Sequence, residues 1–186
     1  MEPRHQEQLA PIIRAARRDD ATRMGEIYVA SWRESYPILL PIPTLVGMSA
    51  NRWARQFAWT ISRGSEIVLV AEDRRDGVIG LATGGPAVDS GLRINGASAG
   101  GEIFALYVAP DHMARGAGAG LLKAMLRRFA DRGHDNAIAW MLKNNPSRFF
   151  YEHMGAKCVA QKQERRFRSV IVLEAYAWTD IRHRSD

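Results

Sequence analysis

The sequence predicts a mixed α/β domain in which helices alternate with strands of one sheet. Short, strongly apolar runs typical of strands are separated by longer segments with apolar residues at the helical period of three to four. A chain of 186 residues is long enough to bury a core without disulfides, and its single cysteine, Cys158, cannot form an intrachain disulfide. No internal repeat or low-complexity tract interrupts the pattern. We therefore expect a single domain over residues 1–186.

The first part of the chain is predicted to hold one strand and two helical regions. A short strand lies within residues 11–20, and the helix that follows, within 20–36, begins with Asp20 as its cap. The Pro-rich segment 37–43 interrupts helical structure, and residues 44–64 form the second helical region.

The later part alternates strands with two helices, one of which follows a glycine-rich turn. Its expected elements are strands at 66–73 and 78–85, a long loop or flared hairpin tip at 84–101, a strand at 102–110, a helix at 120–133, a strand at 136–142, a short helix at 146–155 and strands within 157–167 and 169–180.

Composition excludes several classes of protein. The start of the chain has no apolar signal-peptide core, and prolines break the uncharged run Ser35–Asn51, so we expect no membrane segment and a cytoplasmic location. The five histidines are scattered, which gives no metal site. The net charge is +6, yet other residues interrupt the basic clusters at 14–18 and 162–168. A solvated basic surface is therefore favoured over a nucleic-acid-binding one, which stays a weaker alternative.

The turn in "YVAPDHMARGAGAGLLKAML", residues 107–126, has the character of a phosphate-binding loop. A dinucleotide-binding turn would need a third glycine where Leu121 stands and an acidic residue where Lys143 follows the next strand. A nucleotide-binding P-loop would need Lys and Ser or Thr after Gly120. Two interpretations remain: a helix N-terminus that binds a pyrophosphate through backbone N–H groups, or a Gly/Ala-rich turn packed tightly for steric reasons.

Two motifs resemble those of the GNAT superfamily of N-acetyltransferases. "EIFALYVAPDHMARGAGAGLL" is similar to the central motif, in which a strand leads into Q/R-x-x-G-x-G/A, and Met113 stands where Gln or Arg is usual. "NNPSRFFYEHMGAK" is similar to the later segment N-x-x-A/S-x-x-F-Y-E-x-x-G, and "ASWRESY" resembles the acceptor-side helix of bacterial members. The resemblance covers about residues 12–178 and implies a central mixed, mostly antiparallel sheet flanked by helices.

The resemblance implies that acetyl-CoA is bound as the acetyl donor. The loop would hold the pyrophosphate, and the end of the preceding strand would pair with the pantetheine arm. The residues implied to contact the cofactor are Leu106, Tyr107, Val108, Met113, Ala114, Arg115, Gly116, Ala117, Gly118, Ala119 and Asn144.

Two residues are candidates for proton transfer. Tyr151 matches the family tyrosine that protonates the departing thiolate, and a phenol is protonated at neutral pH. Glu102 stands where some members, notably histone acetyltransferases, carry the general base that accepts the amine proton. The alternatives are a packed core aromatic for Tyr151 and a solvent-facing strand end for Glu102.

The acceptor is expected to be a primary amine of a small molecule, a peptide or a protein. Trp32 and Tyr36, four residues apart on one helix, either wall the acceptor pocket or belong to the core. The alternative to an N-acetyltransferase is a non-catalytic module that binds or senses acyl-CoA. Many family members dimerise, and the sequence neither requires nor excludes a homodimer.

Overall fold

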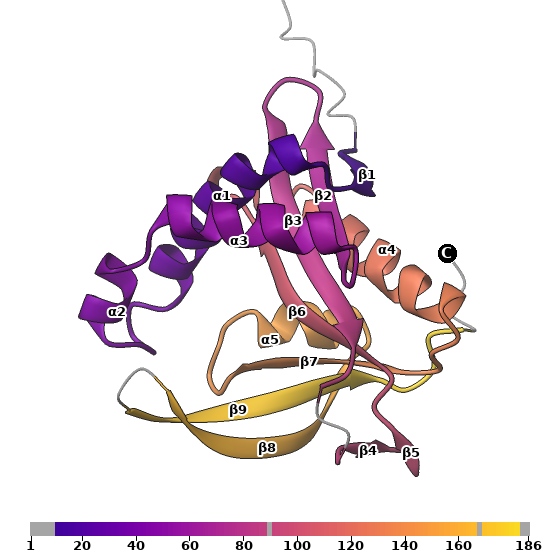
Figure 1. Cartoon of the computed structure of the whole chain (residues 1–186). Helices are drawn as coiled ribbons and strands as arrows, with labels where there is room; N and C mark the ends of the chain where they lie inside the picture. The colour runs from indigo at the N-terminus through magenta and orange to yellow at the C-terminus, as the bar shows by residue number, and fades with distance from the viewer. Residues whose placement is uncertain (1–9, 89–90, 167–168, 183–186) are drawn as a thin grey trace, which may run out of the picture.

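A seven-stranded sheet forms the centre of the protein (Figure 1). The computed structural model describes residues 10–88, 91–166 and 169–182. The sheet has the order β1-β2-β3-β6-β7-β9-β8. Its strands are β1 (Ile12–Ala15), β2 (Ile67–Asp73), β3 (Gly77–Pro86), β6 (Gly101–Val108), β7 (Ala137–Leu142), β8 (Lys157–Arg166) and β9 (Ser169–Trp178).

All neighbouring strands run antiparallel except β6 and β7, which run parallel. This arrangement confirms the predicted mixed, mostly antiparallel sheet. Helices cover both of its faces, with α1 (Ala21–Ser35) and α3 (Ala50–Arg63) on one side and α4 (Ala117–Asp131) and α5 (Arg148–His153) on the other (Figure 1).

Strand β2 shows how the alternation of side chains supplies both cores. Val68 and Val70 point to the face covered by α1 and α3, where they pack near Met24 and Phe57. Ile67, Leu69 and Ala71 point to the opposite face, against α4. A strand buried on both faces has no polar side, which explains the unbroken apolar run in the sequence.

One prediction about the N-terminal helices was wrong, and another holds only in part, since Asp20 stands at the cap position of α1 but makes no side-chain cap bond. The region 44–64 holds two helices, α2 (Ile42–Val46) and α3, because Ser49 starts α3 by accepting a hydrogen bond from the Arg52 N–H at 3.3 Å. Asp20 does not cap α1 with its side chain. Its carboxylate instead accepts hydrogen bonds from the guanidinium of Arg14 on β1 and from the Arg17 N–H.

The glycine-rich stretch 84–101 contains structure that its composition did not specify. Residues 84–86 continue β3, and a two-stranded hairpin forms from β4 (Arg93–Ile94) and β5 (Ala97–Ser98) around Asn95 and Gly96. The hairpin buries Ile94 against Ile138 and Ala177. Asp89 and Ser90 within this stretch, and Phe167 in the predicted strand 157–167, lie outside the described residues.

Strands β6 and β7 separate soon after they begin, and this divergence shapes the rest of the molecule. They pair only over Gly101–Ile103 and Ala137–Ala139, beyond which the two halves of the sheet turn away from each other (Figure 1). Residues 105–108 are apolar and central in the sheet. They are nevertheless partly exposed, because β7 no longer pairs with β6 beside them.

The described part of the chain also shows two absences. None of its helices combines the length and apolar character needed to cross a membrane. No three or more His, Cys, Asp or Glu side chains in it are grouped so as to hold a metal ion.

Candidate active site

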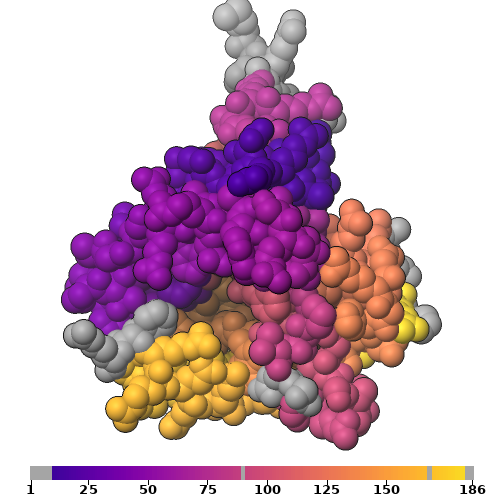
Figure 2. Space-filling view, in the orientation of Figure 1, coloured from indigo at the N-terminus to yellow at the C-terminus, as the bar shows by residue number. Residues whose placement is uncertain are grey.

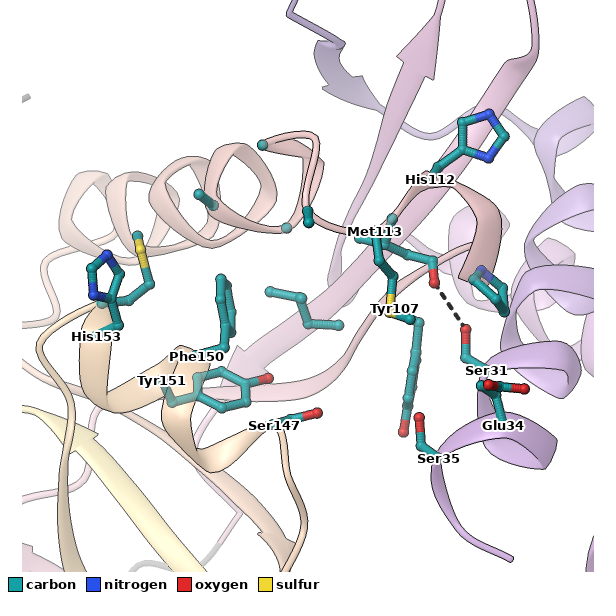
Figure 3. Close-up of a pocket in the computed structure, with 18 residues that line it drawn as sticks. Ser31, Glu34, Ser35, Tyr107, His112, Met113, Ser147, Phe150, Tyr151 and His153 are labelled. Carbon is teal, nitrogen blue, oxygen red and sulfur yellow. Dashed lines mark hydrogen bonds between the residues drawn. The ribbon is translucent and has the colours of Figure 1, made fainter.

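The end of β6 presents an unpaired backbone edge. The Ala109 N–H donates to the Ile79 carbonyl of β3 at 2.8 Å, so Ala109 points toward β3. Because backbone groups alternate in direction along a strand, Val108 and Leu106 point to the opposite edge, where β7 has diverged. One group on that edge has a partner: the Ser31 hydroxyl of α1 donates to the Val108 carbonyl at 3.2 Å (Figure 3). The edge is therefore suited to accept an extended ligand as an additional strand.

A cavity of about 590 Å³ lies along this edge, and we call it the cofactor cavity. Its walls come from the end of β6, the loop before α4, the first turn of α4, one side of α5 and the last turns of α1 (Figure 3). In the same view the Tyr151 and Ser147 hydroxyls point from the α5 side across the cavity toward Tyr107 and Ser35.

The N-terminus of α4 opens onto the cofactor cavity. Gly116 is the residue before the first helical turn and has a φ of 86°, which a residue with a Cβ adopts only with strain. The first backbone N–H groups of a helix have no partner within it, and the helix dipole places positive potential there. This end of the cavity therefore favours an anion such as a pyrophosphate.

Most residues predicted to contact the cofactor come together around this cavity. Those that line it are Leu106, Tyr107, Val108, Met113, Ala114, Gly116, Gly118 and Ala119. Ala117 points into the core instead, and Arg115 is exposed outside the lining. Asn144 is also exposed and outside the lining, with a φ of 67°. Its neighbour Asn145 is the buried one.

Tyr151, the predicted proton donor, lies on the α5 side of the cofactor cavity. It lines the cofactor cavity, and its ring packs edge-on against Phe150 and Trp178 at 5.3 and 5.6 Å between centroids. Burial, together with the nearby Tyr36, raises the pKa of the Tyr151 phenol above its ordinary value. The hydroxyl is therefore protonated throughout the neutral range and available as a proton donor.

A second cavity, of about 560 Å³, opens on the other side of β6, and we call it the aromatic cavity. It lies between the α1–α3 helices and the β8–β9 hairpin, where Figure 2 shows a hollow between the purple and yellow segments. Trp32, Tyr36 and Glu102, all singled out in the sequence, line it. Tyr28 and Trp53 extend the aromatic wall, their rings 4.1 Å apart between centroids.

The separation of β6 from β7 joins the two cavities. A small cavity of about 50 Å³ fills the gap, and both Tyr151 from the cofactor side and Tyr36 from the aromatic side border it. Tyr36 is fixed there because its hydroxyl accepts a hydrogen bond from Asn145 Nδ2 at 3.2 Å and lies 3.4 Å from the Tyr107 hydroxyl. A reacting group bound on one side can therefore meet one bound on the other side at this gap.

Glu102 lies farther from the gap than Tyr36. It stands four residues before Leu106 on β6, roughly 13 Å along an extended strand. Its carboxylate accepts a hydrogen bond from the Val88 N–H at 3.0 Å. Glu102 therefore does not contact Leu106 or Tyr36 directly, and its role as a base stays a prediction.

Sequence reasoning missed several residues of the cofactor cavity. Ser31 and Ser147 contribute hydroxyls, and His112 is held by a 2.9 Å hydrogen bond between its Nε2 and Asp76. A buried serine on the apolar face of α1 was the one available signal, since such a hydroxyl needs a partner. Ser147 lies in a turn and His112 in a short 3₁₀ helix, and the apolar pattern of the sequence does not predict the shape of either.

Comparisons with known proteins agree with this arrangement. The model of the family "FR47-like protein" matches residues 93–166, which include β6, the loop and α4. The uncharacterized N-acetyltransferase YuaI of Bacillus subtilis is 28% identical over 149 residues, which cover 80% of this chain and 82% of YuaI.

Solved structures with the same fold include several acetyltransferases. The ribosomal-protein-alanine N-acetyltransferase of Brucella melitensis has a TM-score of 0.66 at 24% identity, over 90% of this chain and 99% of its own. The yncA protein of Salmonella typhimurium, solved with its cofactor acetyl-CoA, has a TM-score of 0.65 at 20% identity, over 96% and 98%. The PaiA N-acetyltransferase of Thermoplasma acidophilum, in complex with coenzyme A, has a TM-score of 0.65 at 17% identity, over 89% and 98%.

The family resemblance found in the two motifs is thus supported by a sequence match that spans both of them and by the shared fold. The chain is similar in sequence to an N-acetyltransferase and shares the fold of solved acetyltransferases, including those described as GNAT proteins.

Proposed function

We propose that the protein transfers the acetyl group of acetyl-CoA directly to a primary amine. The observation that carries the proposal is the open edge of β6, which lies between a cavity with an anion-binding helix terminus and a second cavity on the other side of the sheet. Two ligands can approach the same strand from opposite sides and meet at the gap between β6 and β7.

The residues present fit acetyl-CoA. The N-terminus of α4, with Gly116 and Gly118 lining the cavity, accepts the pyrophosphate, and the Leu106 and Val108 backbone accepts the amide groups of the pantetheine arm. When bound, acetyl-CoA supplies an activated acyl group as a thioester. Two solved proteins with this fold, yncA and PaiA, hold acetyl-CoA and coenzyme A.

The protein's own groups then move two protons. The acceptor nitrogen must be unprotonated to form its bond to the acyl carbon, and the proton it gives up leaves through water toward Glu102 or solvent. The bond between that carbon and sulfur breaks, and the Tyr151 hydroxyl, which borders the gap, donates a proton to the departing thiolate. Tyr151 regains its proton from water. The products are an amide and the free thiol of coenzyme A.

Replacing Tyr151 by Phe tests this assignment. The variant removes one hydroxyl and leaves the ring packing, so we expect kcat to fall about 100-fold, within the range for loss of a general acid, while acetyl-CoA affinity stays within about twofold. Turnover is measured by release of the coenzyme A thiol with a panel of amines, and affinity by calorimetry.

Tyr176→Phe is the matched control, because Tyr176 is a buried tyrosine that lines neither the cofactor cavity nor the aromatic cavity. Equal rates for wild type and Tyr151→Phe would remove Tyr151 from the mechanism. Tight acetyl-CoA binding without acetylation of any amine, peptide or protein in a broad panel would favour the non-catalytic acyl-CoA-binding module instead.

A further inference from the structure

The residues that line the aromatic cavity indicate which class of acceptor it binds. We propose, on the basis of the proposed acetyltransferase activity, that the acceptor is a small apolar α-amino acid whose carboxylate is bound by Lys162, which lies over the Trp140 ring. The amine would lie at the gap between β6 and β7 and the apolar side chain among the aromatic rings of α1 and α3.

The first argument is the chemistry of the cavity wall. Aromatic rings dominate it: Tyr28 stands 5.4 Å from Trp32, 4.1 Å from Trp53 and 5.1 Å from Tyr107 between centroids. A cavity of about 560 Å³ with such walls matches a small apolar ligand. Rings of this size contribute binding energy mainly to apolar groups that they remove from water.

The second argument is the placement of charge. Among the described lining residues, the charged ones are Glu102 on β6 and Lys162, Glu164 and Arg166 on β8. The Glu164 carboxylate forms ion pairs with Lys162 at 3.0 Å and with Arg166 at 2.5 Å. Two cations and one anion give this group of three a net charge of +1. A polyamine would place several positive charges against this wall, which is unfavourable. A carboxylate there would be attracted.

Glu102 and the β8 charges lie at opposite ends of the aromatic cavity. Glu102 pairs with Ile138 on β7, while Lys162 pairs with Leu173 on β9, which in turn pairs with Leu142. Ile138 and Leu142 are four residues apart, roughly 13 Å along the strand. Glu102 therefore lies too far from Lys162 for one α-amino acid to contact both, and it leaves the positive charge of the β8 group undiminished.

The third argument is the position of Trp140. It borders both the aromatic cavity and the gap between β6 and β7. The centroid of its indole ring lies 4.2 Å from Lys162 Nζ, which stands over the face of the ring. The buried Nε1–H of Trp140 has no hydrogen-bond partner among the described residues, although a buried donor normally has one. This donor is enclosed by the protein and does not face the cavity, whereas the Lys162 ammonium lies over the face of the Trp140 ring, and that ring borders the gap. The short distance from Lys162 to the gap suits an α-amino acid, in which the amine and the carboxylate share one carbon.

The test compares amines of matched shape at saturating acetyl-CoA. The probes are phenylalanine, phenethylamine, which lacks only the carboxylate, spermidine, and a tripeptide that begins with phenylalanine. We expect kcat/KM for phenylalanine to exceed that of each of the other three by about tenfold or more, since a charge-assisted contact is lost in each case. A preference for spermidine, for phenethylamine or for the tripeptide would overturn the proposal.

Variants on β8 separate recognition of a carboxylate from recognition of a second amine. Lys162→Met should lower kcat/KM for phenylalanine about tenfold and leave phenethylamine unchanged. Lys157→Met is the control, because Lys157 is an exposed lysine of the same strand outside the cavity. Glu164→Gln removes the only negative charge of the group of three, which competes for Lys162, and should raise kcat/KM for phenylalanine. A loss on Glu164→Gln with no loss on Lys162→Met would mean that the wall binds a cation and would refute the inference.

Failure of the proposed function is distinguishable from failure of this inference. Turnover of none of the probes or of any other amine would contradict the acetyltransferase activity. In that case saturation-transfer NMR with coenzyme A present still compares the binding of phenylalanine and phenethylamine. Stronger binding of phenylalanine that disappears in Lys162→Met supports the acceptor assignment, and equal binding of both overturns it.

Discussion

At the scale of single residues, the packing of the fold does not require a glycine at position 118, whereas binding of the proposed ligand does. A Cβ at this position would lie 3.6 Å from Phe150 Cζ and 3.7 Å from Val108 Cγ2, which are ordinary contacts. Gly118 nevertheless lines the cofactor cavity at the first turn of α4. The fold therefore has room for a methyl group that the ligand would meet.

We expect Gly118→Ala to lower acetyl-CoA affinity by about tenfold without lowering stability, because alanine favours the helix by about 0.5–1 kcal/mol over glycine. Calorimetry measures the affinity and thermal unfolding the stability. Gly133→Ala, after the end of α4, is the opposite control: Gly133 has a φ of 88°, so the variant should unfold more readily yet bind acetyl-CoA normally. Wild-type affinity in Gly118→Ala would show that the ligand does not approach this turn.

Residue by residue, the sequence predicted the site better where side-chain direction follows from a regular element. Leu106, Val108 and Tyr151 came from the resemblance of two motifs, and the structure places all three on the lining of the cofactor cavity because each lies on a regular element of predicted type. Asn144 and Asn145 differ by one position in a turn, and only the turn's geometry decides which is buried. Lys162 and Trp140 were not predicted as neighbours because their contact depends on pairing across β9.

At the scale of secondary structure elements, an ion pair joins the first strand to the first helix. The Asp20 carboxylate accepts hydrogen bonds from Arg14 Nη1 at 2.7 Å and Nη2 at 3.0 Å, and Arg14 Nε also contacts Glu72 on β2. The hydrogen bonds from Arg14 are the main cause that lowers the pKa of Asp20 below its ordinary value. This bond network holds the N-terminus of α1 against the edge of the sheet.

Because the pKa of Asp20 is lowered in the folded protein, its contribution to stability is present above the unfolded pKa of about 3.9 and disappears as pH falls through the folded value. We expect Asp20→Asn to lower the free energy of unfolding at pH 7 by about 2 kcal/mol, typical of hydrogen bonds to charged groups. The difference from wild type should shrink as pH falls below about 4.

Denaturant unfolding between pH 2 and 7 measures this dependence. Asp19→Asn is the matched control, because Asp19 is the exposed neighbouring carboxylate and should behave as wild type. Equal losses in Asp19→Asn and Asp20→Asn at pH 7 would contradict the role given to the ion pair.

The predicted order of elements agrees with the structure, while several of their ends do not: α4 (Ala117–Asp131) begins three residues before the predicted 120, and α5 (Arg148–His153) is shorter than the predicted 146–155. Apolar periodicity identified each long helix and each strand of the sheet, because burial on a regular element imposes that period. It did not separate α2 from α3, since the break depends on the Ser49 cap and a short turn. The Asp20 carboxylate left its capping position because Arg14, distant in the pattern but adjacent in the fold, provides stronger donors.

At the scale of the whole molecule, the two cavities on opposite sides of β6 allow both substrates to be bound at once. Cys158, the single cysteine of the chain, is exposed on β8 and lines neither cavity. Partial burial also raises the pKa of its thiol, which reduces the thiolate needed for attack. A ternary complex is therefore expected rather than an acetyl-cysteine intermediate.

Initial rates measured over a grid of acetyl-CoA and acceptor concentrations should give intersecting lines in double-reciprocal plots, and Cys158→Ser should keep the wild-type rate within about twofold, since no step passes through the thiol. Parallel lines, or an acetyl group found on the protein by mass spectrometry in the absence of acceptor, would contradict direct transfer.

The open edge of β6 has a consequence for divergence among proteins with this fold. The groups proposed to receive the donor there are amide hydrogens and carbonyl oxygens, which nineteen amino acids supply equally and proline alone does not. The side chains at Leu106 and Val108 pack against the core and are constrained to apolar types by that packing, while contact with the donor through the backbone does not fix which apolar residue stands there. This makes intelligible how proteins only 17% to 24% identical to this chain retain its architecture, and how the acceptor side can diversify without renewed adaptation to the donor.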